Sequence, residues 1–383
     1  RRDGQYLGGG TGSNTGTGTR MCIVGGYTGA VVNTIDYITI STFGNAEDFG
    51  DLASIAYSAG AVGNSTRGFK LGGYTPGISN SVNVFTFASE GDAVDSTNLA
   101  AVTAYPGEFS NEIRGVLAGN SHPGATNVIQ FIELALNNDG LDFGDLSVVT
   151  LATAGCASQT RGIFAGGQSP SASNYIHYVT IMTTGNAADF GDLTRERNPA
   201  SMGSNVRGVF ASGSPGQGPY YTNEMDFISF SSTGNATDFG DNALSLSGAF
   251  GLSNQTMGLN AGGSTPSGAS NALNMITIAQ TGNAVDYGDL TAARNDTKGA
   301  CASPVRGLVF GGITPSITSA IDMITIPTLG NALDFGDLTM GRRAAGALSS
   351  PIRACFAAGY QQPDASGTKT DRIDYVTITS TGD

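Results

Sequence analysis

Short apolar runs alternate with clusters of small and polar residues along the whole chain. In the runs IDYITI (35–40) and VNVFTF (82–87), both alternating faces are largely apolar, as expected of strands that are covered on both sides. Gly, Pro, Asn and Ser separate such runs at intervals of about 8 to 12 residues, and no helical period occurs. The pattern predicts an all-β protein.

The strand pattern is also periodic over a longer distance. The segment TGNAADFGDLT (184–194) has four close copies and two degenerate copies. The first aspartate of this segment lies at Asp48, Asp95, Asp142, Asp189, Asp238, Asp286 and Asp334. Because these positions are 47 to 49 residues apart, the chain is a repeat array.

Two further elements recur once in each repeat. One is an arginine followed by glycine, an apolar stretch and a Gly-Gly pair, as in RGIFAGG (161–167). Its first residue is Arg67, Arg114, Arg161, Arg207, Arg306 and, in less regular copies, Arg20 and Arg353, with Met257 in the remaining copy. The other is an apolar strand that begins near Ile35, Val82, Val128, Ile176, Met225, Leu273, Ile321 and Ile373. Each element therefore occurs eight times.

Four strands in a repeat of about 48 residues are typical of a β-propeller blade. We expect a strand of small residues innermost, then the arginine strand, then the IDYITI-type strand, with DFGDL outermost. Eight repeats nearly fill the 383 residues, which predicts one domain of eight four-stranded blades; seven blades plus an extra partial repeat is the alternative. The expected blades are residues 1–52, 53–99, 100–146, 147–193, 194–242, 243–290, 291–338 and 339–383, the last without its outer strand.

The charge of the chain excludes some classes of partner. A formal net charge of −13 repels nucleic acids and anionic membrane surfaces, and no local basic patch offsets it. No run of about 18 apolar residues occurs, so we expect no membrane insertion. The chain begins at Arg1 rather than Met, which we interpret as a segment of a longer polypeptide.

The repeated GNAxDFGD segment has the composition of a cation-binding loop. Asn186, Asp189 and Asp192 are spaced three residues apart between glycines, and such oxygen ligands suit Ca²⁺. Each copy supplies only about three of the six to eight ligands that Ca²⁺ takes. A turn in which these side chains accept backbone N–H groups is the stronger interpretation, so we expect no cofactor and keep structural Ca²⁺ as the alternative.

The arginine and aromatic positions have structural interpretations. The repeat arginines could form a positively charged ring for an anionic ligand, but we favour hydrogen bonds to carboxylates or carbonyls of the same or the next blade, such as the DFGD aspartates. An aromatic side chain follows the first aspartate of the DFGD segment, and we expect it to fill space within the blade. These aromatic residues are Phe49, Phe143, Phe190, Phe239, Tyr287 and Phe335.

The sequence gives little support for catalysis. Its only histidines are His122, in a variable loop, and His177, in an IDYITI-type strand. Nothing in their spacing predicts a Ser-His-Asp set or a two-histidine metal site. We therefore expect that the protein is not an enzyme.

The loop after each Gly-Gly pair varies most between repeats. Since strand polarity repeats in every blade, all of these loops should emerge on one face of the ring, where binding specificity usually resides. Aromatic rings there suit stacking on sugars or filling a protein interface. The candidate ligand-binding residues are Tyr27, Tyr74, His122, Tyr220, Tyr221 and Tyr360.

The Gly-Gly pair, the variable loop and the following aromatic-containing strand resemble the kelch type of propeller, although the chain has no tryptophan. The strings RGIFAGG (161–167) and NYIHYVTIMTTGNAADFGDLT (174–194) also resemble repeat-bearing virion structural and tail-fibre-like proteins of contractile-tailed phages that infect marine cyanobacteria. This resemblance implies a virion or extracellular protein that is not an enzyme. Its expected partners are other subunits of a surface assembly, further copies of itself in a homo-oligomer, and a cell-surface glycan or protein receptor. A carbohydrate-active propeller enzyme and an intracellular kelch-like adaptor are the alternatives.

Overall fold

The computed structural model describes residues 50–337, except for 55–58, 65, 75–76, 87–90, 105, 112, 121–123, 151–152, 169–170, 217–219, 296–299 and 303–304. Only the backbone is described at 301 and 314 and in the strands before residue 50 and after residue 337. The described residues form strands and turns, and no helix occurs among them.

Five sheets have four antiparallel strands each, and a sixth has the same four strands plus two short strands from the start of the chain; within each set of four, the strands pair in chain order. We call these sheets complete blades and name each by its residue range. The 60–98 blade contains β6 (Gly60–Gly63), β7 (Arg67–Leu71), β8 (Ser81–Thr86) and β9 (Val94–Asn98). The 107–150 blade contains β10 (Gly107–Ser110), β11 (Arg114–Ala118), β12 (Thr126–Glu133) and β13 (Leu141–Thr150). The 154–192 blade contains β14 (Ala154–Ala157), β15 (Arg161–Ala165), β16 (Tyr175–Thr180) and β17 (Ala188–Asp192).

The other three complete blades follow the same plan. The 198–246 blade contains β18 (Asn198–Gly203), β19 (Arg207–Ser214), β20 (Thr222–Ser229) and β21 (Thr237–Leu246). The 250–289 blade contains β22 (Phe250–Ser253), β23 (Met257–Ala261), β26 (Ala272–Thr277) and β27 (Val285–Asp289), and its loop forms the small hairpin of β24 (Ser264–Thr265) and β25 (Gly268–Ala269). The 300–337 blade contains β28 (Ala300–Ala302), β29 (Arg306–Phe310), β32 (Ala320–Thr325) and β33 (Leu333–Asp337), with a loop hairpin of β30 (Ile313–Thr314) and β31 (Ser316–Ile317).

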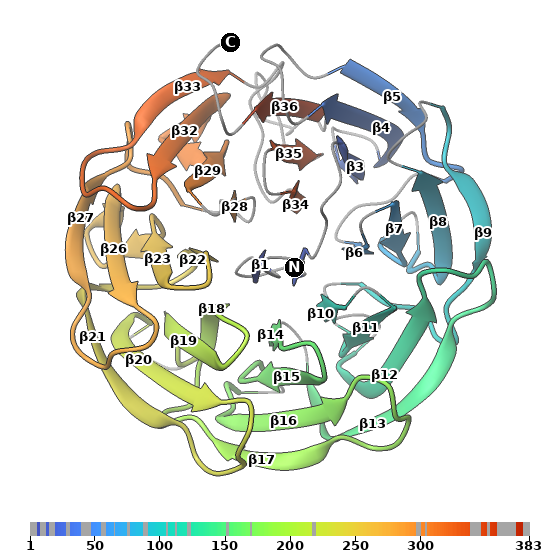
Figure 1. Cartoon of the computed structure of the whole chain (residues 1–383), viewed down its shortest axis with the longest axis horizontal. Helices are drawn as coiled ribbons and strands as arrows, with labels where there is room; N and C mark the ends of the chain where they lie inside the picture. Colours follow the sequence, from blue (N-terminus) through green and yellow to red (C-terminus); the bar gives the residue numbers. More distant parts are fainter. Residues whose placement is uncertain are drawn as a thin grey trace.

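The complete blades are arranged around a central axis, as expected of a β-propeller (Figure 1). The first strand of each blade lies nearest the axis and the fourth strand lies on the circumference. The predictions of an all-β propeller and of this strand order are confirmed.

Two three-stranded sheets lie side by side at the top of Figure 1. One contains β3 (Arg20–Tyr27), β4 (Val31–Thr39) and β5 (Glu47–Asp51); the other contains β34 (Gly346–Ser350), β35 (Arg353–Ala357) and β36 (Ile373–Thr377). β3 contacts β34 and β35, and β4 contacts β35 and β36. The described strands therefore form six complete blades rather than eight.

The first strand of the chain is not where the repeat alignment puts it. β1 (Tyr6–Leu7) and β2 (Ser13–Asn14) lie near the axis, and β1 pairs with β18 through Leu7 and Gly203. The expected first blade, residues 1–52, would have used this segment as its own innermost strand. A strand near the axis faces the inner strands of several blades, so pairing within its own repeat is not the only choice open to it.

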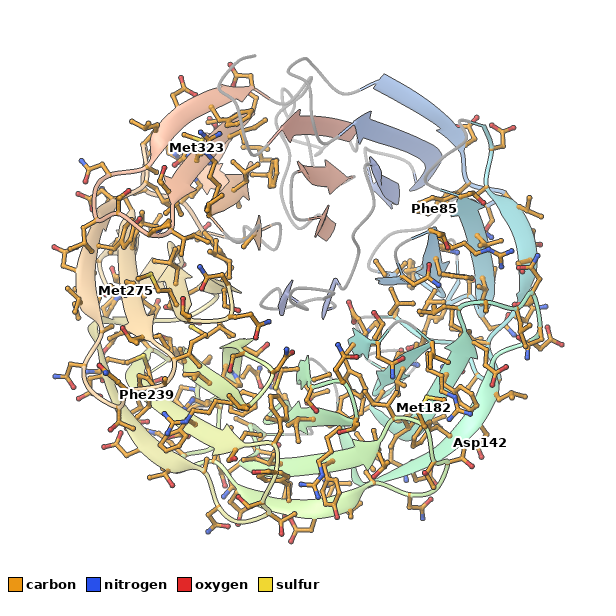
Figure 2. The ribbon with its side chains drawn as sticks, in the orientation of Figure 1. Phe85, Asp142, Met182, Phe239, Met275 and Met323 are labelled. Atoms are coloured by element: carbon orange, nitrogen blue, oxygen red, sulfur yellow. The ribbon has the colours of Figure 1, made fainter. Side chains whose placement is uncertain are left out.

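Side chains fill the space between neighbouring sheets (Figure 2), and the glycine of the RG element explains how they fit. A Cβ atom on Gly162 would lie 1.9 Å from the ring of Phe109, which belongs to the inner strand of the preceding blade. Gly115, Gly208, Gly258 and Gly307 face Val62, Cys156, Met202 and Leu252 in the same way. Each inner strand thus inserts one side chain into a gap that only glycine leaves in the next blade. Cys156 is a free thiol, and burial raises its pKa.

Candidate functional site

The GNA part of the repeated segment joins each blade to the blade before it. Gly185 and Ala187 donate their N–H groups to the carbonyls of Phe143 (2.6 Å) and Asp145 (2.8 Å) in the preceding outer strand. In return, the Asp145 N–H donates to Asn186 Oδ1 at 3.0 Å. We call this set of three hydrogen bonds an inter-blade clasp. It extends the outer strand of one blade with backbone from the next.

All three bonds of the clasp occur on β13, β17, β21 and β27, and two of the three are described on β5 and on β9. The amide oxygens of Asn235, Asn283 and Asn331 accept the N–H groups of Asp192, Asp241 and Asp289. In the degenerate repeats, Asp92 and Asp139 replace asparagine and accept the N–H groups of Asp51 and Asn98. A carboxylate oxygen accepts a hydrogen bond as well as an amide oxygen does, so the degenerate repeats keep this bond between the side chain and the outer strand.

The three residues that we considered as cation ligands make contacts in the clasps and in a local turn. Asn186 contacts Asp145, whereas Asp192 contacts Asn235 on the other side of the blade. Asp189 Oδ1 accepts the Gly191 N–H at 3.0 Å, which closes a turn within the segment. Among the residues that the structure describes, no group of three or more His, Cys, Asp or Glu side chains could hold a metal ion. The contacts are those of a turn and a joint between blades.

The repeat arginines lie at the start of the second strand of their blades, and three of them bond to the backbone that directly follows the third strand of the next blade. Arg161 stacks its guanidinium over Tyr178, 4.9 Å from the ring centroid, and donates to the Phe230 carbonyl of the next blade at 2.6 Å. The same two contacts are made by Arg114 (over Phe131, to Ile181) and Arg207 (over Phe227, to Ile278). The predicted bonds to carbonyls of the next blade are present. The suggested bonds to DFGD aspartates are wrong for these three arginines, because stacking turns each guanidinium toward the neighbouring backbone.

The other members of this arginine column vary. Arg67 donates to Asn137 Oδ1 at 2.9 Å in the next blade, and Arg306 is half-buried at the same position of β29. The side chain of Arg353 lies outside the described residues. The guanidinium groups of Arg67, Arg114, Arg161 and Arg207 all bond to the neighbouring blade, so these four do not form an open cationic ring.

The aromatic column completes the packing of each blade. Phe190 meets Tyr178 edge to face, with ring centroids 5.9 Å apart, and is therefore covered by the ring on which Arg161 stacks. Phe143 and Phe239 meet Phe131 and Phe227 in the same manner. Tyr287 and Phe335 are buried, and the single hydroxyl proton of Tyr287 is shared between the carbonyls of Thr325 and Thr328. The side chain of Phe49 lies outside the described residues.

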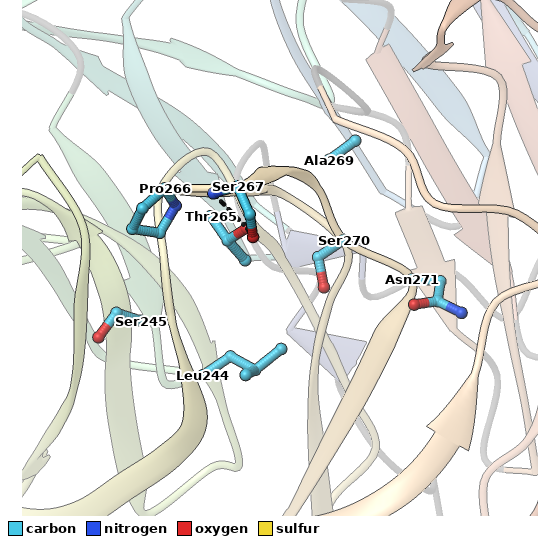
Figure 3. Close-up of a pocket in the computed structure, with 8 residues that line it drawn as sticks. All are labelled: Leu244, Ser245, Thr265, Pro266, Ser267, Ala269, Ser270 and Asn271. Atoms are coloured by element: carbon cyan, nitrogen blue, oxygen red, sulfur yellow. Dashed lines mark hydrogen bonds between the residues drawn. The ribbon is translucent and has the colours of Figure 1, made fainter.

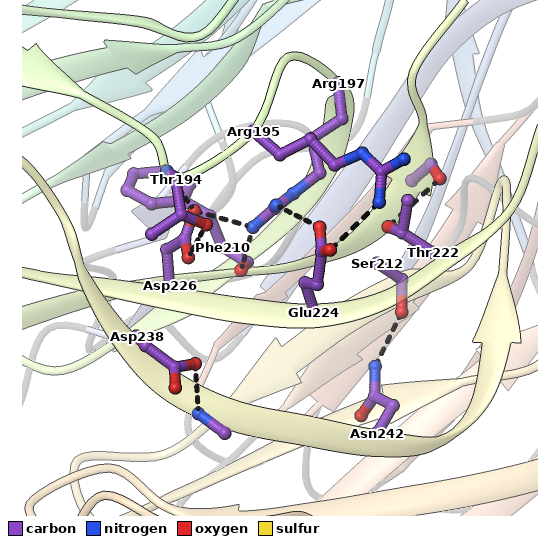
Figure 4. A network of polar contacts seen from close by, with 12 residues as sticks. Thr194, Arg195, Arg197, Phe210, Ser212, Thr222, Glu224, Asp226, Asp238 and Asn242 are labelled. Carbon is purple, nitrogen blue, oxygen red and sulfur yellow. Dashed lines mark hydrogen bonds and ion pairs between the residues drawn. The ribbon is translucent and has the colours of Figure 1, made fainter. Parts of the chain in front are cut away.

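A second polar position, in the middle of the IDYITI-type strand, is buried in every complete blade. In the 198–246 blade it is Asp226, which is 1% exposed and pairs with fully buried Arg197 at 2.9 Å (Figure 4). Arg197 also reaches Glu224, which is shared with the more exposed Arg195. Burial lowers the pKa of Arg197, and the Asp226 and Glu224 carboxylates oppose this shift.

The 300–337 blade repeats this ion pair with Arg294 and Asp322, 2.8 Å apart and both fully buried. Asp322 also accepts the N–H and hydroxyl of Thr291, and Arg294 donates to the carbonyls of Gly311 and Ala320. These contacts satisfy most of the hydrogen-bonding groups that burial removes from water.

The buried position is neutral in the remaining complete blades. The residue is Asn83, Gln130, His177 or Asn274 in the other complete blades, and all four side chains are buried. In the 250–289 blade, Leu246 stands where the repeat alignment places Arg197 and Arg294, and Asn274 Oδ1 accepts the Ala243 N–H at 3.3 Å. In five complete blades the position ties the segment that leads into the blade to the third strand, with or without charge. In the 60–98 blade, Asn83 Nδ2 donates to Asp95 Oδ1 at 3.4 Å.

One of these ties joins two residues whose contact could not be predicted from the sequence. Ser147 Oγ lies 2.6 Å from His177 Nε2, and Asp189 and Asp192 are close enough to act on the imidazole electrostatically. The serine is exposed and the histidine is 4% exposed. A serine and a histidine are therefore in contact, which their spacing did not predict. Thr291 and Asp322 hold the same two repeat positions with a hydroxyl-to-carboxylate bond, which identifies the contact as a structural tie.

His177 makes this tie sensitive to acid. Burial lowers its pKa, and Asp189 and Asp192 offset the shift only in part. The unfolded chain has a histidine pKa of about 6.5 and binds the proton more readily, so stability is lost as the pH falls below about 6.5 toward the folded-state pKa. We expect the thermal unfolding midpoint of the native chain to fall more steeply between about pH 7 and pH 5 than that of His177→Asn. Equal slopes would contradict this assignment; asparagine is the natural residue of the same position at Asn83.

Lys70 is a second buried base beside a hydroxyl. Its Nζ donates to Ser81 Oγ at 2.7 Å, and Ser81 is also bonded to Ser79. Burial lowers the pKa of Lys70 to about 8, and the Asp95 carboxylate opposes this shift. The equivalent position of the next blade is Leu117, so the lysine is specific to the 60–98 blade.

The predicted ligand-binding residues fall in different blades. Just before β20, Tyr220 is 59% exposed and Tyr221 is half-buried, whereas Tyr74 is half-buried and bridges to Ile78 in the 60–98 blade. The structure does not gather these three tyrosines in one loop cluster. The side chains of Tyr27, His122 and Tyr360 lie outside the described residues.

A hollow lies instead between the end of β21 and the loop of the 250–289 blade (Figure 3). Its volume is about 530 Å³. Hydroxyl and amide side chains share the wall with apolar ones, and no charged residue contributes to it. The lining residues are Leu244, Ser245, Thr265, Pro266, Ser267, Ala269, Ser270 and Asn271. The hollow was not predicted from the sequence. β21 has ten residues, as β13 does, whereas the other described outer strands have five.

Comparisons with known proteins bear on the fold. No family model matches the chain, and no curated protein matches it. Among the described residues, no helix is long and apolar enough to cross a membrane. The solved structures that match include one titled "Structure of YjhT", with a TM-score of 0.55 and 8% sequence identity; the match covers 72% of this chain and 95% of that chain. At such low identity the chain shares with that protein its fold alone.

Proposed function

We propose that the protein is a non-enzymatic structural protein of a virion or an extracellular surface, in which a rigid propeller displays variable loops for assembly or for adhesion to a glycan or protein receptor. The single observation that carries this proposal is the use of the polar repeat positions. Asn186, Arg161 and Asp226 all hold one blade to another or a linker to its blade, while the variation between repeats is concentrated in loops. Because the polar repeat positions hold the scaffold together, we expect binding to take place at the variable loops.

Mass spectrometry of purified virus particles, with electron microscopy of the isolated protein, tests this function. The proposal expects the chain in the particle and a regular oligomeric assembly of copies or neighbouring subunits. Recovery of the chain only as a free monomer inside cells would contradict it and favour the intracellular adaptor.

We further propose that the two three-stranded sheets act as blades, which gives eight blades in all. Support comes from the eight copies of the arginine and IDYITI-type elements and from the two sheets found beside one another at the top of Figure 1. Electron microscopy class averages viewed along the axis should contain eight radial densities. Seven densities would support the alternative of seven blades and a partial repeat.

A hydrolase is the second candidate, because Ser147 and His177 form a short contact beside Asp189. We expect no activity from this set, since the equivalent residues Thr291 and Asp322 form a structural tie. A fluorophosphonate probe, which labels activated serines, should therefore leave Ser147 unmodified in the native chain. Labelling that is lost in both Ser147→Ala and His177→Asn would reverse this conclusion and identify a nucleophile.

A further inference from the structure

The hollow between the 198–246 and 250–289 blades has an uncharged wall that carries hydrogen-bonding groups. Ser245, Thr265, Ser267 and Ser270 supply hydroxyls and Asn271 supplies an amide. A hydroxyl can donate one hydrogen bond and accept two, and an amide side chain both donates and accepts. The wall therefore suits a ligand that itself has many groups of both kinds.

Two of these side chains make no hydrogen bond with the described part of the protein. The Ser245 hydroxyl and the Asn271 amide have no protein partner there, although Asn271 is half-buried and its backbone carbonyl accepts the Leu290 N–H. Ser270 is 6% exposed, and its oxygen accepts the Ala272 N–H at 3.1 Å, which leaves the hydroxyl hydrogen available. Buried or half-buried polar groups gain most from a partner that replaces water.

The same wall has an apolar component. Leu244 is 42% exposed and Pro266 is exposed at the turn of the small hairpin, and both line the hollow (Figure 3). Apolar surface next to hydroxyls matches a sugar ring, which has C–H groups on its faces and hydroxyls around its edge. A volume of about 530 Å³ lies within the range of about 300–1,000 Å³ usual for small-ligand sites.

The hollow is fixed in shape by both blades. Ser247 and Ser264 exchange two backbone hydrogen bonds of 3.0 and 2.8 Å, which hold the loop against the end of β21. Asn295 Nδ2 donates to Ser264 Oγ at 2.9 Å from the following linker, and Thr265 Oγ1 donates to the Gly268 carbonyl at 3.0 Å within the hairpin. A site that is ordered before binding loses less entropy when the ligand arrives.

We propose that this hollow binds a neutral sugar, such as a terminal monosaccharide of a surface glycan. Anionic sugars fit less well, because no lining side chain is charged and the net charge of −13 repels anions. The inference rests on the proposed adhesive function and names its ligand class and site.

Saturation-transfer NMR of the full chain tests the site with a panel of neutral methyl glycosides and with sialic acid as the anionic comparison. We expect at least one neutral glycoside to bind, sialic acid not to bind, and Ser245→Ala/Asn271→Ala to weaken binding about tenfold or more, the effect of removing two hydrogen bonds. Ser231→Ala is the matched control, because Ser231 is an exposed hydroxyl in a turn of the same chain outside the hollow. The unfolding midpoints of both variants should equal that of the native chain, so a change in binding reports the site.

Two outcomes overturn the sugar site and leave the structural role of the protein in place. One is that no neutral glycoside binds, although the chain is found in particles. The other is that a glycoside binds equally well to the native chain and to Ser245→Ala/Asn271→Ala. Sugar binding that the double variant abolishes, in a chain absent from particles, would support the site and contradict the proposed virion location.

Discussion

Replacing Arg294 with leucine should lower the free energy of unfolding by about 3–5 kcal/mol, because it leaves the Asp322 carboxylate buried without its counter-charge. Both side chains are fully buried, so water cannot take the place of the guanidinium. Thr291 would still donate two hydrogen bonds to Asp322, but these do not neutralise the charge. Urea titration followed by intrinsic tyrosine fluorescence or circular dichroism measures the loss.

The chain itself supplies the compensating variant. Leu246 and Asn274 occupy the two equivalent positions of the 250–289 blade, so Arg294→Leu/Asp322→Asn reproduces a pair that the fold already accepts. We expect the double variant to recover most of the loss, leaving a deficit of about 1–2 kcal/mol, and the cycle of single and double variants gives the coupling energy. A double variant as unstable as Arg294→Leu would mean that the buried charge is not what destabilises the single variant.

The second large effect concerns the inter-blade clasp. Gly191 has a φ of +141°, and a Cβ atom there would lie 2.5 Å from the backbone of Gly234 in the clasping segment. Gly191→Ala should therefore destabilise the protein by about 2–4 kcal/mol, through backbone strain together with displacement of the clasp. The midpoint of urea unfolding measures this effect.

Gly234→Ala separates the two causes. Gly234 has nearly the same backbone conformation, with a φ of +149°, but a Cβ atom there meets nothing within 4 Å. This control carries the strain without the collision, so we expect it to cost at least about 1 kcal/mol less than Gly191→Ala. Equal losses would show that strain alone accounts for the requirement for glycine.

The propeller could be predicted because its signals are repeated. One copy of GNAxDFGD is ambiguous, but seven first aspartates at regular spacing identify a repeat, and strand order within a blade follows from chain order. The arrangement at the ends of the chain could not be predicted in this way. Pairing of β1 with β18 joins residues far apart in sequence, and no local pattern encodes such a choice.

The site was less predictable, because its contacts cross from one repeat to the next. Asn186 is followed closely by Asp189 and Asp192, which suggested one ligand set, yet its actual partner is Asp145 in the repeat before. The contact of Ser147 with His177 is hidden for the same reason. Comparison of the repeats does contain the signal: arginine at position 197 or 294 accompanies aspartate at 226 or 322, and leucine at 246 accompanies asparagine at 274.

The inter-blade clasp has a direction. In each pair, the side chain that secures an outer strand lies 41 to 43 residues further along the chain than the backbone N–H that it accepts. During synthesis, a blade can therefore be secured only after the next repeat has left the ribosome. Truncation at a repeat boundary would uncover the outer strand before it, and an unpaired strand edge invites association with other chains. The order of translation is thus also the order in which the ring can be closed.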